Sequence, residues 1–140
     1  MQNAVAQCGS PERGPRGVGC GRVQTYARYF GVFEKSALER VDLPHTLRKI
    51  EYNTFKGCTR LKSIELPERL EYIGKYCFKG SALEGVCLPP LLKTINEYTF
   101  CKCEKLRHVT FASEGELAEI GEYCFKESGL EEITLPQGVR

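Results

Sequence analysis

The chain has 140 residues, of which 41% are hydrophobic and 27% charged, and its formal net charge is +2 at pH 7. This composition is typical of one soluble domain, and no run of about 18 apolar residues offers a membrane-spanning segment. Residues 1–30 carry four arginines and one glutamate, a net charge of +3, which leaves −1 on the other 110 residues. Neither part has the dense basic stripe that nucleic-acid binding requires.

The first segment, residues 1–22, is rich in Gly, Pro and Arg and has no apolar periodicity. It is predicted to be a disordered tail. The start of the chain also lacks the apolar central region of a secretory signal, so the sequence by itself indicates a cytoplasmic protein or a chain without its native leader.

The next segment, residues 23–33, is predicted to be an N-terminal cap. Its aromatic residues are spaced as on one face of an amphipathic helix, and the open end of a repeat array needs such a cover. These residues are Tyr26, Tyr29, Phe30 and Phe33.

Residues 34–140 are copies of one pattern: Leu-x-x-Ile/Val-x-Leu-Pro, then Leu-x-x-Ile, then Phe after four more residues. The phenylalanines recur at intervals of 22, 23, 22 and 25 residues, at Phe33, Phe55, Phe78, Phe100 and Phe125. A period in the low twenties means one supersecondary unit per copy, too small to fold alone and stabilised by stacking on its neighbours.

This pattern closely resembles the BspA-like (treponemal-type) leucine-rich repeats, whose units carry an Ile-Gly-x-x-Ala-Phe core. Ile73-Gly74 and Ile120-Gly121 match that core, whereas Cys77 and Cys124 stand where the family favours Ala. The resemblance covers residues 33–140. It implies a curved, β-rich solenoid of about five rungs of 22–25 residues, with little α-helix outside the N-terminal cap. It also implies a recognition or adhesion surface on a cell-surface or secreted protein.

In each copy the Leu-x-x-Ile-x-Leu piece suits a short strand that ends at its Pro. Alternation points the Val or Ile of each strand inward and its two neighbours outward. Sheet faces of solenoids commonly bind partners, so the varied outward residues are the candidate site, with a merely solvated face as the alternative. The candidates are Arg40, Asp42, Ser63, Glu65, Cys87, His108, Thr110, Glu132 and Thr134.

A second candidate surface is the position two before each Phe, which holds Tyr76, Tyr98 and Tyr123. Stacked tyrosines form an aromatic strip of a kind enriched at interfaces, but they are equally compatible with a half-buried wall. The position after each Phe is predicted to be a solvated basic edge, formed by Lys56, Lys79, Cys101 and Lys126.

Charge alternates from copy to copy at the position after the first Leu: Glu39, Lys62, Glu84, Arg107 and Glu131. Parallel strands lie about 4.8 Å apart, so this column is predicted to be a ladder of opposite charges that sets the register of stacking.

The eight cysteines indicate neither disulfides nor a metal site. Cys58 and Cys103 alternate with Ser at one repeat position, and Cys77 and Cys124 alternate with Thr at another. Like positions are therefore two rungs, about 10 Å, apart, beyond the span of a disulfide. Small, buried thiols are expected there. Cys101 stands in the lysine column and is expected to be exposed and reactive.

Catalysis has one candidate geometry, a thiol and an imidazole at Cys87 and His108 on adjacent copies. An open sheet face neither excludes water nor builds an oxyanion hole, so we expect no enzyme and no cofactor. The favoured function is recognition of a protein or glycan partner through the outward strand face. The alternative is a scaffolding segment that associates through the open edge of its last copy.

Overall fold

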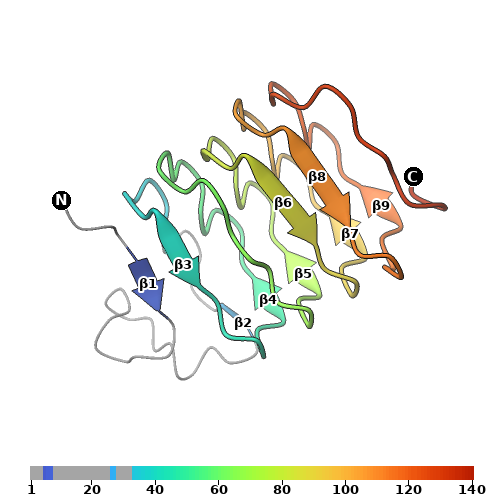
Figure 1. The fold of residues 1–140 in the computed structure, drawn as a ribbon, viewed down its shortest axis with the longest axis horizontal. Helices are drawn as coiled ribbons and strands as arrows, with labels where there is room; N and C mark the ends of the chain where they lie inside the picture. The colour runs from blue at the N-terminus through green and yellow to red at the C-terminus, as the bar shows by residue number, and fades with distance from the viewer. Residues whose placement is uncertain (1–4, 8–25, 28–32) are drawn as a thin grey trace.

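A computed structural model describes residues 5–7, 26–27 and 33–140 of this protein. The repeats stack as successive turns of a β-solenoid (Figure 1). We number the turns as rungs: rung 1 is 38–60, rung 2 is 61–82, rung 3 is 83–105, rung 4 is 106–129 and rung 5 is 130–140. The described residues contain no helix, and therefore none that would be long and apolar enough to cross a membrane.

Two stacks of parallel strands run along the solenoid, and the first forms the outward face. Its strands are β1 (Val5–Gln7), β3 (Arg40–Asp42), β6 (Gly85–Leu88) and β8 (His108–Phe111). They form two separate pairs, β1 with β3 and β6 with β8. Segment 61–67 of rung 2, between β3 and β6 in Figure 1, and segment 130–136 of rung 5 contain no strand. The outward sheet is therefore interrupted.

The second stack follows the Leu-x-x-Ile part of each copy. It consists of β2 (Tyr26–Ala27), β4 (Lys49–Ile50), β5 (Tyr72–Ile73), β7 (Thr94–Ile95) and β9 (Glu119–Ile120). In this stack β2, β4 and β5 form one sheet, and β7 and β9 form another. Each strand is only two residues long because the chain turns again at once toward the Phe.

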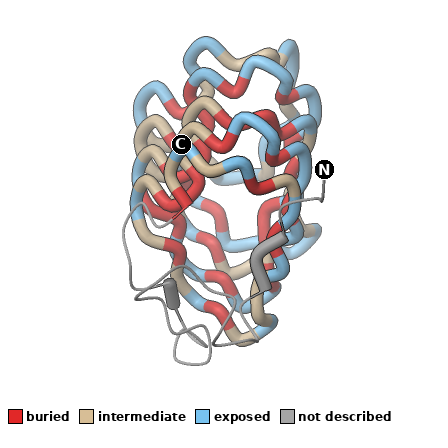
Figure 2. The backbone as a smooth tube through the Cα atoms, turned by 90° about the vertical axis from the view of Figure 1, so that its left-hand side faces the viewer, coloured by how far each residue is buried: buried red, intermediate tan, exposed pale blue. Residues whose placement is uncertain are grey.

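The core consists of columns of equivalent side chains, and Figure 2 shows the buried positions alternating with exposed ones along every rung. The five repeat phenylalanines stack with ring centroids 5.4–5.6 Å apart and planes within 11° of parallel. Each fully buried Leu, Ile or Phe contributes about 1.5–3 kcal/mol relative to exposure. The other buried columns include Leu61, Leu83 and Leu106; Ile64, Val86 and Val109; Leu70 and Leu92; and Ile50, Ile73 and Ile95.

We call the phenylalanine-containing turns the turn side of the solenoid; they span 51–58, 74–81, 96–103 and 121–128. Main-chain hydrogen bonds cross this side without a break: the amide of each Phe from Phe33 to Phe100 donates to the next rung, at 2.9–3.0 Å. The residues two before and two after Phe adopt positive φ. Gly57 and Gly80 suit this conformation, whereas Tyr98 and Lys102 adopt it as strained non-glycine residues.

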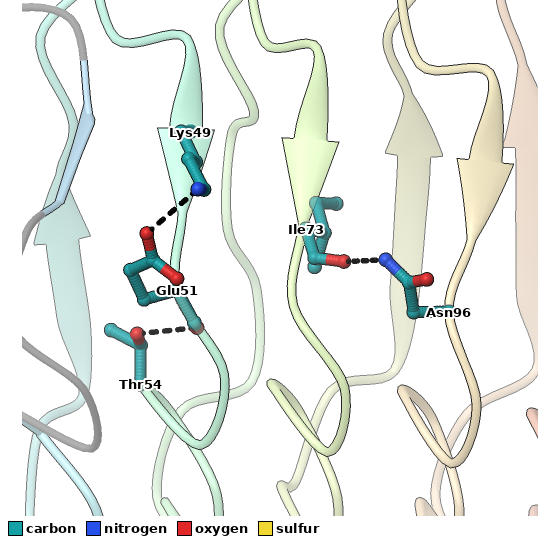
Figure 3. A network of polar contacts seen from close by, with 5 residues as sticks. All are labelled: Lys49, Glu51, Thr54, Ile73 and Asn96. Carbon is teal, nitrogen blue, oxygen red and sulfur yellow. Dashed lines mark hydrogen bonds and ion pairs between the residues drawn. The ribbon is translucent and has the colours of Figure 1, made fainter.

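The residue that follows the Ile of each strand in the second stack alternates between glycine and a polar residue from rung to rung. Rungs 2 and 4 have Gly74 and Gly121 there, where an added Cβ would lie within 2.6 Å of the main chain of the preceding rung. Rungs 1 and 3 have polar residues instead (Figure 3). There Thr54 donates to the Glu51 carbonyl at 2.7 Å, and Asn96 Nδ2 donates to the Ile73 carbonyl at 2.6 Å. The chain is thus built from pairs of unlike rungs.

The N-terminal segments differ from their predictions wherever the structure describes them. Val5–Gln7, in the expected disordered tail, form β1 and pair with β3, and Tyr26–Ala27, in the expected helical cap, form β2 and pair with β4. A parallel strand satisfies the amides and carbonyls at the edge of rung 1, which a helix packed on that edge would leave unpaired. The remaining residues of both segments lie outside the described part.

Candidate partner-binding surface

The outward face carries the nine candidate residues with their side chains turned to solvent. Burial alternates along β3, β6 and β8, with Val41, Val86 and Val109 buried and their neighbours in the candidate set exposed. The same holds in the segments without a strand, where Ser63 and Glu65 flank the buried Ile64. The period of two therefore oriented these side chains as predicted.

Strand register places the candidate thiol and imidazole on adjacent rungs but not directly opposite each other. In the β6–β8 pair, Cys87 lies opposite Thr110, and His108 lies opposite Gly85. The two candidate groups are therefore diagonal neighbours on an open sheet face, about 7–8 Å apart at their backbones. In the described part of the chain no hydrogen bond joins the Cys87 thiol to the His108 imidazole, so the contact through which a base activates a nucleophile is not formed.

The outward face is hollowed where β3 meets rung 2 without strand pairing. This first hollow has a volume of about 490 Å³ and is lined by Arg40 and Asp42 on one side and by Ser63, Glu65 and Glu68 on the other, with His45 at its end. One arginine against three carboxylates gives it a net charge of −2 with His45 neutral.

A second hollow of about 650 Å³ lies where β8 meets rung 5, again without strand pairing. His108, Thr110 and Ser113 line it from rung 4, and Glu131, Glu132 and Thr134 from rung 5. Arg107 also lines it, but its Nη1 donates to the carbonyl oxygens of Glu104, Leu106 and Gly129. With His108 neutral, the net charge of these groups is −1.

None of the carboxylates of the two hollows forms an ion pair with another described residue. Six ion pairs join described residues, and every one of them lies outside the two hollows. Asp42, Glu65, Glu68, Glu131 and Glu132 therefore present uncompensated negative charge to a partner on this face.

The predicted charge ladder is not formed: among the described residues no ion pair joins two members of that column. Glu39 pairs with Arg60 at 3.8 Å, a residue of the turn, and Arg107 binds main-chain carbonyl oxygens. Side chains as long as arginine reach whichever acceptor is nearest, so alternation of sign in one column does not decide its pairings.

The second candidate surface forms a stacked strip on the turn side. Tyr76 and Tyr98 stack at 4.9 Å between ring centroids, and Tyr98 and Tyr123 at 5.1 Å. Removal of water by this packing, together with the neighbouring phenols, raises the pKa of Tyr98, which therefore stays neutral. The rings cover one another's faces, and Tyr76 and Tyr98 are half-buried, so this part of the strip is a wall of the solenoid, whereas Tyr123 at its end is 51% exposed.

Lysines flank this strip through cation–π contacts. The ammonium of Lys79 lies 5.4 Å from the Tyr76 ring centroid and 5.9 Å from that of Tyr98, and Lys126 lies 5.2 Å from Tyr123. Such exposed contacts are worth about 0.5–1 kcal/mol each. Lys56 also lies 5.8 Å from the Tyr76 centroid, so the basic edge predicted from the sequence is present at its three lysine positions.

The prediction that Cys101 is exposed and reactive is wrong, because its side chain is only 2% exposed. A lysine at this position buries its stem and places its ammonium in water, but a cysteine is too short to leave the buried part. Of the six cysteines that the structure describes, all free, only Cys87 is exposed.

The other four thiols occupy the small buried sites expected of them. Cys58 and Cys103 donate to the carbonyl oxygens of Phe33 and Phe78, each at 3.0 Å. Burial raises the pKa of both, and likewise that of Cys77, and raises the pKa of Cys124 to about 12. No cluster of three metal-binding side chains occurs among the described residues.

Sequence reasoning missed the two hollows. It treated His45 as a turn residue and did not single out Glu68 or Ser113, which line them. Segment 61–67 matches the strand pattern as well as β6 does, so the pattern offers no signal that its pairing with β3 is absent.

Comparison with known proteins identifies the repeat. A family model described as "BspA type Leucine rich repeat region" matches residues 29–140 in six copies. No curated protein is significantly similar to this sequence.

Two solved structures share the fold. One is a leucine-rich repeat protein from Bacteroides ovatus, 24% identical over 76% of this chain and 40% of that one, with a TM-score of 0.56. The other is a leucine-rich repeat protein from T. pallidum, 20% identical over 84% of this chain and 65% of that one, with a TM-score of 0.52. This chain spans less than two thirds of the length of either.

Proposed function

This chain belongs to the BspA-type leucine-rich repeat family, and we propose that it is a non-enzymatic recognition module that binds a protein partner through the outward strand face. The observation that supports the proposal most is the difference between that face and the rest of the solenoid. The outward face carries varied exposed side chains and two hollows whose carboxylates are unpaired, whereas the turn side is filled by stacked rings.

From the family resemblance, we propose that the protein is located at the cell surface or outside the cell. Labelling intact cells with a membrane-impermeant amine reagent tests it. Modification of the protein on intact cells supports a surface location, and modification only after lysis contradicts it.

Affinity capture from cell lysate and surface extract tests the binding face. The double variant Glu65→Lys with His108→Glu changes only that face and should lose a partner that the parent chain retains. A matched control, Glu122→Lys with Tyr123→Glu, makes the same net charge change on the turn side and should retain it. Loss of the partner from the control alone would contradict the assignment to the outward face.

A glycan is the other class of partner compatible with an exposed polar face. Protease or glycosidase treatment of the extract before capture distinguishes the two. The proposal predicts loss of capture after protease treatment, whereas loss only after glycosidase treatment would contradict it.

A second function, scaffolding through the edge of rung 5, is favoured by the exposure of that rung. Leu135 is 44% exposed, and Leu130, Ile133 and Val139 of the same rung are only partly buried, as is Phe125 at the end of rung 4, unlike most of their equivalents in rungs 2 and 3. Molecular mass measured across a tenfold dilution tests this function. A mass that rises with concentration and returns to the monomer in a Leu135→Glu variant would support edge association, and a constant monomer mass would contradict it.

A further inference from the structure

The outward face has a low middle between its two hollows. The first outward residues of rungs 2 and 3 are Ser63, in the segment without a strand, and Gly85, at the start of β6; the next small outward residues are Cys87 on β6 and Thr110 on β8. A Cβ added at Gly85 would make only ordinary contacts, at 3.5–3.6 Å, with the carbonyl oxygen and Cβ of His108 on the next rung, so the glycine leaves the surface low without a clash to prevent a small side chain. A chain that crosses rungs 2 and 3 over Ser63 and Gly85 meets small side chains there, and His108 stands beside this path on rung 4.

The two hollows are three rungs apart along that path. The first lies between rungs 1 and 2 and the second between rungs 4 and 5. Parallel strands are spaced about 4.8 Å, which places the hollows about 14 Å apart. In an extended peptide, residues i and i+4 point to the same side and are separated by about 13–14 Å. The spacing of the hollows therefore matches two side chains four residues apart.

Charge decides which side chains fit. Both hollows are net negative, and their carboxylates have no ion-pair partner within the described part of the chain. Acidic segments and phosphate-bearing surfaces would be repelled, whereas a lysine or arginine placed in each hollow would pair with these carboxylates.

We propose that the outward face binds an extended segment of a partner protein that crosses the rungs and places one basic side chain in each hollow, with these two residues four positions apart and a small residue between them. This inference rests on the proposed function and names the class of partner for that face. The partner's chain runs across the strands, over Ser63 and Gly85, and is not an added strand of the sheet.

Titration of blocked heptapeptides into the ¹⁵N-labelled full chain, followed by NMR, tests the inference. The matching probe is Thr-Lys-Thr-Ser-Thr-Lys-Thr. Its isomer Thr-Lys-Thr-Ser-Lys-Thr-Thr has the same composition and charge, but its lysines point to opposite sides. The matching probe should bind about fivefold more tightly than the isomer, because the isomer can fill only one hollow. Raising the salt concentration should reduce this difference.

Carboxylate variants locate the binding. Glu65→Gln with Glu68→Gln removes charge from the first hollow, and Glu131→Gln with Glu132→Gln from the second. Each pair should weaken the matching probe about fivefold. The control pair, Glu71→Gln with Glu119→Gln, removes two exposed carboxylates outside the hollows and should leave the affinity within twofold. Retained spectral dispersion shows that each variant is folded.

Four results would overturn the inference. Equal affinity for the two isomers would show that a spacing of four residues is not required. Equal affinity for a probe with Glu in place of Lys would show that the face does not prefer basic side chains. Chemical-shift changes centred on Tyr76, Tyr98 and Tyr123 would show that the probe binds the turn side and not the hollows. If no probe binds while the Glu65→Lys, His108→Glu variant still loses its captured partner, the inference fails and the proposed function stands.

Discussion

The turn side and the outward face are built from the same repeats but are ordered in opposite ways. On the turn side, ring stacking and main-chain hydrogen bonds continue from rung to rung, and three of the six ion pairs connect neighbouring turns. On the outward face, strand pairing stops twice and the side chains differ on every rung. Stability is therefore concentrated on one side, which leaves the other side free to vary its surface.

The largest expected difference between the two sides comes from the phenylalanine stack. Phe78 is completely buried between Phe55 and Phe100, so Phe78→Ala should lower the free energy of unfolding by about 3–5 kcal/mol. Ser63→Ala, on the outward face, should change it by less than about 0.5 kcal/mol. Urea unfolding followed by circular dichroism measures both. Similar losses of unfolding free energy in the two variants would contradict the difference in stability between the two sides.

Two glycines give a matched comparison of backbone spacing. In Gly74→Ala the new methyl would clash with the main chain of Tyr52, and separating the rungs should cost about 1–3 kcal/mol. Gly85→Ala meets only ordinary contacts on the outward face and should raise stability by about 0.5–1 kcal/mol. Thermal unfolding of both variants checks the signs, and a destabilised Gly85→Ala would contradict the absence of a clash at Gly85.

Alkaline pH should act through the buried thiols of the turn side. Their pKa is raised on folding, so above pH 9 the folded chain holds more protons than the unfolded chain, and stability falls as pH rises. For Cys124 the fall continues to about pH 12. Cys124→Thr, which copies the residue at Thr54 and Thr99, should lessen this fall by up to about 1.4 kcal/mol per pH unit.

Urea midpoints at pH 8 and pH 10.5 measure this effect. Cys87→Ser is the control, because Cys87 is exposed and on the outward face, and it should leave the slope unchanged. An identical alkaline slope in the parent chain and in Cys124→Thr would mean that the thiol at this position does not titrate on unfolding.

The smallest expected effects come from the strained turn residues. Lys102 has a φ of 58° where rungs 1 and 2 have Gly57 and Gly80, so Lys102→Gly should stabilise by about 1 kcal/mol. Its ion pair with Glu127 at 3.9 Å is exposed and contributes little. Gly80→Lys should destabilise by a similar amount. Chemical unfolding of the two variants should show opposite signs, and a loss of stability in Lys102→Gly would contradict the strain.

Several features followed from the sequence because they depend on position within the repeat. The columns led by Leu61, Ile73 and Phe78 are buried as their spacing predicted, and the outward positions are exposed. The small buried thiols were predictable for the same reason, since Cys58 and Cys103 alternate with Ser, which also fits the site.

Other features could not be predicted from the sequence, because they depend on the neighbours of a residue in the folded structure. Cys101 is buried because neighbouring rungs cover a position that only a long lysine can leave. Tyr26 and Ala27 form a strand, although their aromatic neighbours are spaced for a helix, because the edge of rung 1 offers hydrogen bonds to an extended chain. Glu39 pairs with Arg60, although Lys62 was predicted, because side-chain reach decides the partner.

The sequence by itself determined the period, the inward and outward faces and the family, because a repeat places equivalent residues at equivalent points of every rung. Only the tertiary structure decided where strand pairing fails on the outward face, and hence where the two hollows and their carboxylates lie. The physical reason is that pairing between rungs depends on main-chain geometry, which side chains of the same pattern leave unspecified.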